Sequence, residues 1–377
     1  MVPMAGIYIH IPFCRQKCHY CNFHFSVSHK NKDPLVESII REIELSKGYL
    51  ETDILDTLYF GGGTPSLLSA DELGRIIQKL RENYRFSEDI ECTLEANPDD
   101  LNVSFLKELR AVGINRLSMG VQSFIDSELT LMNRAHTSVQ AKQSLEDVMK
   151  TGFTDITIDL IFGMPGSTLE SWKSNLDHAL QYDIPHFSLY NLTVEKRTAL
   201  HHFIESGQIK SIADGLMAEQ FMMTMDYLTK AGYEHYEISN YARPGRYARH
   251  NTSYWQGASY LGIGPSAHSY NGHSRRWNIA NNSKYIKSIQ SDIIPFEEEK
   301  LSIEDQYNEY ILTGLRTQWG CDLNRISAFG PAFENYFKQL VAKELKDQRI
   351  QCQGNIFTLT RAGKLFADEV SSGLFYS

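Results

Sequence analysis

Three cysteines near the start of the chain have the spacing of a metal-binding loop. Cys14, Cys18 and Cys21 form a C-x3-C-x2-C pattern directly after the apolar segment 7–11. Thiolates are the ligands that iron–sulfur clusters use, and three of them on one loop can hold three irons of a cubane. The fourth iron is then open to a small chelating molecule. The pattern therefore predicts a [4Fe–4S] cluster with one free coordination position.

A structural zinc site is the alternative for the same cysteines. Zinc takes four ligands in a closed tetrahedron. His10, His19 and His24 lie close by in the sequence, and any one of them could be the fourth ligand. The spacing alone leaves both metals open. The remaining cysteines are scattered, which is typical of small buried residues: Cys92, Cys321 and Cys352.

Glycines and polar residues that could bind a cofactor follow later apolar segments. The run Gly61-Gly62-Gly63-Thr64 lets the backbone approach a ligand and point N–H groups at it, or it is simply a tight turn. Glu95 could accept hydrogen bonds from an ammonium group or from ribose hydroxyls, although it could also be a solvated acid. Arg134 could hold a carboxylate in a bidentate grip. Gln122 and Asp159 are further polar residues of this kind, and Asp159 could instead tie loops together.

The elements that must position these residues alternate between short apolar strands and amphipathic helices. Strands are predicted at 7–11, 57–60, 90–95, 116–121, 156–162 and 187–192, and helices at 34–49, 70–84, 103–112, 139–151 and 169–181. This alternation predicts a parallel sheet with helices packed outside, either doubly wound or closed into a full or partial barrel. The polar turns follow the carboxyl ends of strands, where barrels place their active sites. That position favours the barrel.

The pattern changes twice further along the chain. We expect a core at 1–195, a barrel extension and connecting region at 196–300, and a C-terminal domain at 301–377. In the last part, helices at 304–319, 324–329 and 333–346 precede a strand at 356–359 and a helix at 361–370. Helices followed by a small β wing resemble a winged-helix module. Such a domain would either close over the site or dock a partner.

Charge and hydropathy narrow the classes of partner. The formal net charge is −9, which gives no support to binding of a nucleic-acid backbone. No apolar run is long enough for a transmembrane segment, and residues 1–11 lack the layout of a signal peptide. We therefore expect a cytoplasmic protein that does not bind nucleic acid.

Several strings resemble one known family, in order along most of the chain. The cysteine pattern with Tyr20 before its last cysteine resembles the signature of the radical S-adenosyl-L-methionine (SAM) superfamily. Longer strings resemble the oxygen-independent coproporphyrinogen III oxidase group: Tyr8-Ile-His-Ile-Pro-Phe-Cys14, Phe60-Gly-Gly-Gly-Thr-Pro-Ser66, Leu117-Ser-Met-Gly-Val-Gln122 and Asp159-Leu-Ile-Phe-Gly-Met-Pro165. The resemblance implies an α/β fold, a partial (β/α)6 TIM-like barrel, with SAM bound at the open iron of the cluster.

The resemblance also implies which residues touch the cofactor. Gly62, Gly63 and Thr64 would grip the amino and carboxylate end of SAM, and Glu95 would contact it. Tyr8 and Tyr20 are carried over as residues of the SAM site. The positions that match contacts to a second SAM molecule are Gln122, Arg134 and Asp159. No residue is assigned a catalytic role.

Two features depart from the oxidase pattern. The oxidase continues C-x3-C-x2-C-x-C, whereas Phe23 stands at the extra cysteine position here, and this chain begins almost at its first strand. The string His250-Asn-Thr-Ser-Tyr-Trp255 looks like the branch of the family called HemW, which are heme chaperones. A histidine beside aromatic residues could ligate heme iron and stack on a porphyrin. The alternative for His250 is a turn with a pair of core aromatics.

These observations support two functional interpretations. The first is a heme chaperone that binds heme and transfers it to an apo-haemoprotein. The second is a coproporphyrinogen III oxidase that converts propionates to vinyl groups by 5′-deoxyadenosyl radical chemistry, using a reductant such as flavodoxin or ferredoxin. Phe23 and the His250 string favour the chaperone. A radical SAM enzyme with an unrelated substrate is a third interpretation, because a fold does not fix a function.

Overall fold

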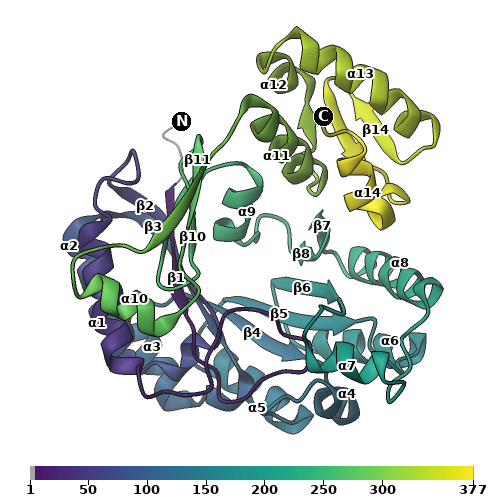
Figure 1. Ribbon diagram of the computed structural model, residues 1–377. Helices are drawn as coiled ribbons and strands as arrows, with labels where there is room; N and C mark the ends of the chain where they lie inside the picture. Colours follow the sequence, from purple (N-terminus) through teal and green to yellow (C-terminus); the bar gives the residue numbers. More distant parts are fainter. Residues whose placement is uncertain (1–4, 377) are drawn as a thin grey trace.

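Six consecutive strand–helix units build the part of the molecule that carries the cysteines. The computed structural model describes residues 5–376. The strands are β1 (Ala5–Ile11), β2 (Ile54–Gly62), β3 (Arg85–Ala96), β4 (Arg116–Gln122), β5 (Asp155–Phe162) and β6 (His186–Asn191), all parallel and adjacent in chain order. The helices between them are α1 (Lys32–Leu45), α2 (Ala70–Asn83), α3 (Val103–Val112), α4 (Asp126–Leu131), α5 (Ser138–Lys150) and α6 (Leu169–Ala179). Figure 1 shows these helices around the outside of a curved sheet, which confirms the partial (β/α)6 barrel.

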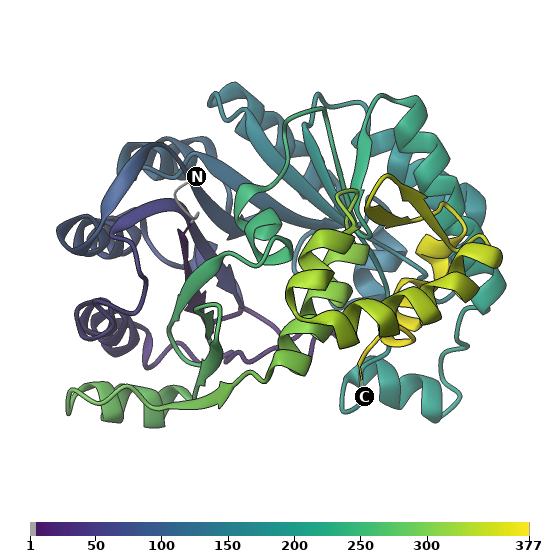
Figure 2. The same cartoon turned by 90° about the horizontal axis from the view of Figure 1, so that it is seen from above.

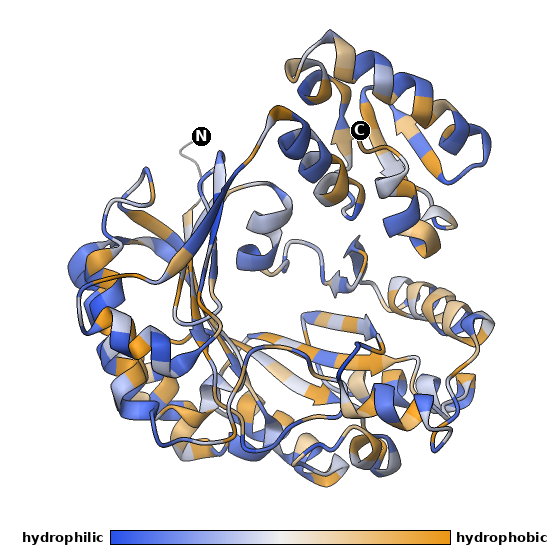
Figure 3. Ribbon diagram, viewed as in Figure 1, coloured by the Kyte–Doolittle hydropathy of each residue, from blue (hydrophilic) through white to orange (hydrophobic). Residues whose placement is uncertain are grey.

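Helix α2 illustrates how local sequence produces these units. Ser69 and Glu72 form a reciprocal capping box that satisfies free N–H groups at the start of the helix. The buried residues of the helix recur at helical spacing, so one face packs on the sheet: Ala70, Leu73, Ile76, Ile77 and Leu80. Figure 3 shows the central strands as mainly hydrophobic and the helices as two-faced. Burial of both faces of a parallel sheet explains why these strands are near-continuous apolar runs.

The sheet continues beyond the six units on both edges. Its order is β12-β11-β10-β9-β1-β2-β3-β4-β5-β6-β8-β7, so the first and last strands are not joined and the barrel stays open. The added strands are short: β7 (Glu234–Glu237), β8 (Asn240–Ala242), β9 (Ser259–Ile263), β10 (His268–Tyr270), β11 (Ser274–Asn278) and β12 (Phe296–Lys300). The helices of this part of the chain are α7 (Ala199–Glu205), α8 (Asp214–Lys230), α9 (Arg249–Trp255) and α10 (Asn282–Ile289).

The last part of the chain has a core and a small sheet of its own. Its helices are α11 (Ile303–Leu315), α12 (Leu323–Ala328), α13 (Pro331–Lys346) and α14 (Ala367–Ser372), and its strands are β13 (Cys321–Asp322), β14 (Ile350–Gln353) and β15 (Ile356–Leu359). This mostly helical unit stands beside α9 and the β7 edge of the barrel, where Glu237 pairs with Thr317 (Figures 1 and 2). Cys352 lies on β14 and is exposed, so the expectation that the scattered cysteines are buried is wrong there. Within residues 5–376, no helix is both long and apolar enough to cross a membrane.

Candidate cofactor-binding site

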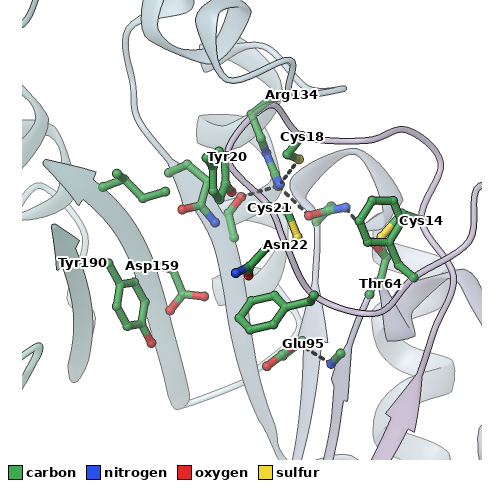
Figure 4. Close-up of a pocket in the computed structure, with 18 of the residues that line it drawn as sticks. Cys14, Cys18, Tyr20, Cys21, Asn22, Thr64, Glu95, Arg134, Asp159 and Tyr190 are labelled. Carbon is green, nitrogen blue, oxygen red and sulfur yellow. Dashed lines mark hydrogen bonds between the residues drawn. The ribbon is translucent and has the colours of Figure 1, made fainter. Parts of the chain in front are cut away.

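A cavity of about 660 Å³ lies at the carboxyl ends of the barrel strands. It is lined by all the site residues predicted from the sequence except two, Tyr8 and His250. The lining set comprises Cys14, Cys18, Tyr20, Cys21, Gly62, Gly63, Thr64, Glu95, Gln122, Arg134 and Asp159. Figure 4 shows several of these side chains directed toward one another. The fold therefore brings together residues that are up to 145 positions apart in sequence, from Cys14 to Asp159.

The three cysteines occupy one loop between β1 and α1. The loop is pinned by backbone hydrogen bonds, in which Cys14 N donates to Ser26 O (3.0 Å) and Ser26 N donates to Pro12 O (2.9 Å). All three thiols are partly exposed and line the cavity. Within residues 5–376, no three His, Cys, Asp or Glu side chains converge as they would on a single metal ion. A cubane instead attaches each thiolate to a separate iron, and this donor set of three thiols fits that group.

The histidines that could have completed a zinc site are engaged elsewhere. His10 Nε2 lies 3.0 Å from His24 O, and His19 Nδ1 lies 2.9 Å from Leu131 O. His24 Nε2 lies 2.7 Å from Asn282 Oδ1. None of the three lines the cavity. The arrangement therefore favours a cluster held by three cysteines over a four-coordinate zinc site.

Arg134 places a buried cation beside the cysteine loop. Its guanidinium donates to Cys18 Sγ (3.4 Å) and to Gly120 O (2.9 Å), and it also contacts Asn97. The Nε of Arg134 is buried and has no hydrogen-bond partner among the described residues. A buried donor without an acceptor is costly, and an anionic group bound in the cavity would satisfy it. The cavity therefore fits a ligand that carries a carboxylate.

The glycine turn after β2 lies directly against the strand that leads to the cysteines. Gly63 N donates to Ile11 O (2.9 Å), and a Cβ at Gly63 would lie 2.6 Å from Phe13 O. Gly62 has φ of 110°, a conformation that side chains rarely adopt. Gln122, at the end of β4, also adopts a left-handed conformation with φ of 66°. Such a conformation is strained at a residue other than glycine, and backbone strain is concentrated at ligand sites, which supports a binding role for the turn at Gln122.

Two carboxyl groups with raised pKa values lie on neighbouring parts of the cavity wall. Glu95, on β3, accepts hydrogen bonds from Tyr59 Oη (2.8 Å) and from Gly62 N (3.2 Å), and burial raises its pKa to about 7. Burial, followed by the charge of Glu95, raises the pKa of Asp159 to about 7 as well. Ser118 Oγ lies 3.3 Å from both oxygens of Asp159. The cavity thus holds protonatable groups that a cationic ligand would ionise.

These raised pKa values predict a pH-dependent stability. The pKa of Asp159 is higher in the folded protein than in the unfolded chain. Its contribution to folding stability is therefore fully present below about pH 4 and is lost as the pH rises through about 7. We expect the cofactor-free protein to be less stable at pH 8 than at pH 5, and Asp159→Asn to reduce that difference by on the order of 1–3 kcal/mol. Urea unfolding at pH 5 and at pH 8 measures this difference in unfolding free energy. Asp155→Asn, at an ion pair with Arg246 on the protein surface, is the control, and an equal effect of both substitutions would contradict the assignment.

Tyr8 and His250 do not line the cavity. Tyr8 stacks on Tyr59. His250 is 1% exposed, with Nδ1 2.8 Å from Thr57 Oγ1 and Nε2 2.5 Å from Tyr254 Oη. A heme ligand needs a free ring nitrogen that the ligand can reach. In this structure His250 offers neither, and its environment matches the alternative of a buried residue among core aromatics.

Several lining residues did not emerge from the sequence. They are Asn97 and Ser118, Tyr190 and Asn191 at the end of β6, and Phe23, Phe25 and Glu195. Asn97 directly follows β3, and Tyr190 and Asn191 end β6, so their positions at the carboxyl ends of strands were a signal available in the sequence. Phe23 and Tyr190 line the cavity and are 70% and 43% exposed, which places these two aromatic side chains at its mouth.

Comparisons with family models, with sequence relatives and with solved structures all point to one protein family. Residues 8–179 match the family model of the radical SAM superfamily, and residues 301–366 match that of the HemN C-terminal domain. The heme chaperone HemW of Bacillus subtilis is 33% identical over 97% of this chain and 98% of its own length. The heme chaperone HemW of Lactococcus lactis is 37% identical over 88% of this chain and 84% of its own length. The structure of coproporphyrinogen III oxidase (HemN) from Escherichia coli superposes with a TM-score of 0.86 at 25% identity, covering 99% of this chain and 90% of that one.

Proposed function

This chain belongs to the HemW family of the radical SAM superfamily, and on that premise we propose that it binds heme and transfers it to a haemoprotein. The observation that carries the proposal is similarity to heme chaperones from one end of the chain to the other. Membership of the superfamily implies a [4Fe–4S] cluster and SAM. In this proposal, Cys14, Cys18 and Cys21 hold the cluster.

The cavity wall supports a SAM site next to that loop. SAM carries a carboxylate, an ammonium and a sulfonium, so it needs both signs of charge around it. Arg134, which the family resemblance assigned to a second SAM molecule, here supplies an unpaired buried Nε for the carboxylate, while Glu95 supplies a carboxyl group for the cationic end. Gly62, Gly63 and Thr64 border the same space. When bound, the cluster and SAM supply one-electron redox chemistry, which in a chaperone would control heme delivery.

The mouth of the cavity offers a surface for a porphyrin. Phe23 occupies the position of the extra cysteine in the oxidase pattern, and it lines the cavity with Phe25 and Tyr190. Porphyrins present flat apolar faces on which aromatic rings stack. Phe23 is 70% exposed and Tyr190 is 43% exposed, so both rings are accessible to a ligand at this mouth. We therefore place the heme at this mouth.

The heme-chaperone proposal is tested on anaerobically reconstituted protein. With added heme, a Soret band should stay with the protein through gel filtration and then move to a heme-free globin used as acceptor. With coproporphyrinogen, SAM and a reductant, no protoporphyrinogen should form. Turnover would instead make the protein an oxidase, the function of its structural relative HemN.

A substitution at the mouth should separate heme binding from cofactor binding. We expect Phe23→Ser to weaken heme retention by about tenfold, since a buried aromatic contact contributes on the order of 1–2 kcal/mol. Its iron and sulfide content should be unchanged. Val27→Ser is the matched control, because Val27 is 57% exposed on the same loop and does not line the cavity. Equal heme affinity in the two variants would exclude the proposed heme surface.

A further inference from the structure

Three rings stack in a column inside the barrel, and the column leads to Glu95. Tyr8 on β1 and Tyr59 on β2 stack with centroids 6.0 Å apart at 25°, and Tyr59 and His250 of α9 stack at 5.0 Å and 22°. From the middle ring, Tyr59 Oη donates to Glu95 Oε1 (2.8 Å). At the far end, Tyr254 packs its edge against His250 (4.8 Å, 78°). The column therefore connects α9, which lies outside the cavity, with a carboxyl group on the cavity wall.

Hydrogen bonds fix the orientation of His250 in that column. Its Nδ1 meets Thr57 Oγ1 and its Nε2 meets Tyr254 Oη, so neither nitrogen is free. Burial, together with nearby Arg116, lowers the pKa of His250 to about 3, and the ring is neutral at neutral pH. A neutral imidazole donates from one nitrogen and accepts at the other, which matches two hydroxyl partners. The ring can therefore neither rotate nor shift without losing a bond.

The strand that carries Glu95 also holds the start of α9. The two oxygens of Glu91 accept hydrogen bonds from Arg249 N and His250 N, both at 2.9 Å. Glu91 and Glu95 lie four residues apart on β3. One strand thus anchors both the helix that presents His250 and the carboxyl group to which Tyr59 donates. This double attachment fixes the distance that the column must span.

Two strands approach the column closely, each at a glycine. A Cβ at Gly6 would lie 2.5 Å from Thr57 Oγ1 and 3.1 Å from His250 Nδ1. A Cβ at Gly61 would lie 2.8 Å from Tyr8 Cε2, 2.9 Å from Tyr59 Cε1 and 3.1 Å from Glu95 Oε1. Glycine at both positions lets the rings lie directly on the strands. A displacement at one end of such a close-packed column is transmitted to the other end.

We propose that His250 and Tyr254 of the His250-to-Trp255 string position Glu95 for SAM through Tyr59, and that His250 is not a heme ligand. The proposal deepens the SAM site described above and rests on it. His250 acts as a positioning residue, because it touches Tyr59 and not the cofactor. Removing its ring leaves a cavity into which Tyr59 can tilt, and Glu95 then loses the hydroxyl that holds its oxygen in place.

The test measures SAM affinity and heme retention on the same reconstituted protein. SAM binding is followed by the change in the electron paramagnetic resonance signal of the reduced cluster, and heme by its Soret band. We expect His250→Ala and Tyr59→Phe each to weaken SAM binding about tenfold, and the double variant to be no worse than either alone, since both break one connection. Heme retention should stay within twofold. Unchanged SAM affinity, or loss of the Soret band in His250→Ala, would overturn the proposal.

Two further measurements distinguish positioning from simple destabilisation. His186 is the matched control, because its ring is also buried between a threonine and a tyrosine hydroxyl, Thr157 Oγ1 (3.0 Å) and Tyr236 Oη (2.7 Å), and it does not touch Tyr59. His186→Ala should leave SAM affinity unchanged, and an equal loss there would refute the specific role of His250. Tyr59→Phe keeps the ring in the column and removes only the hydroxyl, so it tests the connection even if His250→Ala fails to fold.

The pH profile of SAM binding provides an independent readout. The hydrogen bond from Tyr59 stabilises the ionised form of Glu95, so its loss should move the midpoint of the profile to higher pH in both variants. A profile that does not move in Tyr59→Phe would count against the proposal. Failure of the heme-chaperone function would show differently, as absence of the Soret band in the unmodified protein with SAM binding intact.

Discussion

Cys18→Ala is expected to yield a folded protein that retains almost no iron–sulfur cluster. The three thiols lie on one loop, and a cubane that loses one of three thiolate ligands has two open irons, which water and oxygen attack. The loop itself should persist, because its backbone bonds at Cys14 and Ser26 remain when Cys18 Sγ and its contact with Arg134 are lost. Iron and sulfide per chain, measured after anaerobic reconstitution, should fall to near zero. The SAM-dependent change in the cluster signal should vanish with them.

Cys352→Ala provides the control for this loss. Cys352 is an exposed thiol on β14, in the C-terminal unit with its own core. Its removal should leave iron content and SAM binding unchanged. Full iron content in Cys18→Ala would contradict the assignment of the cluster loop. Stoichiometric zinc in the unmodified protein, prepared without added iron, would favour the tetrahedral alternative.

Gly63→Ala is expected to disrupt SAM binding by displacing the glycine turn that borders the cavity. The added Cβ would lie 2.6 Å from Phe13 O, 2.9 Å from Phe13 N and 3.0 Å from Ile11 O, all of them backbone atoms. Backbone cannot rotate away as a side chain can, so the turn and the strand must separate. We expect a loss of about 1–3 kcal/mol in unfolding free energy and SAM affinity too weak to measure. Urea unfolding and SAM titration of the reconstituted protein measure the two effects.

Gly215→Ala is the matched control for this substitution. Gly215 lies in α8, where a Cβ would meet nothing within 4 Å. Alanine is favoured over glycine in a helix, so this variant should be slightly more stable and bind SAM normally. Comparable losses in Gly215→Ala and Gly63→Ala would show that close backbone approach at the turn is not what the site requires.

The core of the fold was predictable because its signals are local. Most of the parallel strands are largely buried, and the predicted strand 90–95 corresponds to the buried second half of the longer β3. The strands at the sheet edges were missed for the opposite reason. β12 is Phe-Glu-Glu-Glu-Lys and exposed along its whole length, so it carries no apolar alternation. Polar edge strands of this kind protect a sheet from further pairing, at the cost of a recognisable pattern.

The site likewise has features that local sequence predicts and features that it does not. The family resemblance predicted that Glu95, Arg134 and Asp159 belong to the cofactor site, and all three line one cavity with the cysteines. The environment of His250 was not predictable, because its partner Thr57 lies 193 residues away and on another element. A histidine beside aromatic residues looks the same in sequence whether it faces a porphyrin or a buried threonine. Only the packing of α9 into the barrel distinguishes them.

The confinement of all three cysteines to one pinned loop affects how the protein can be maintained. No strand of the sheet has to separate for a cluster to enter or leave, because the ligands lie between β1 and α1 and face an open cavity. A chain whose cluster has been destroyed by oxygen is therefore expected to keep its barrel and its cysteine loop. On the proposed assignment, we expect such a chain to take up new iron and sulfide without refolding.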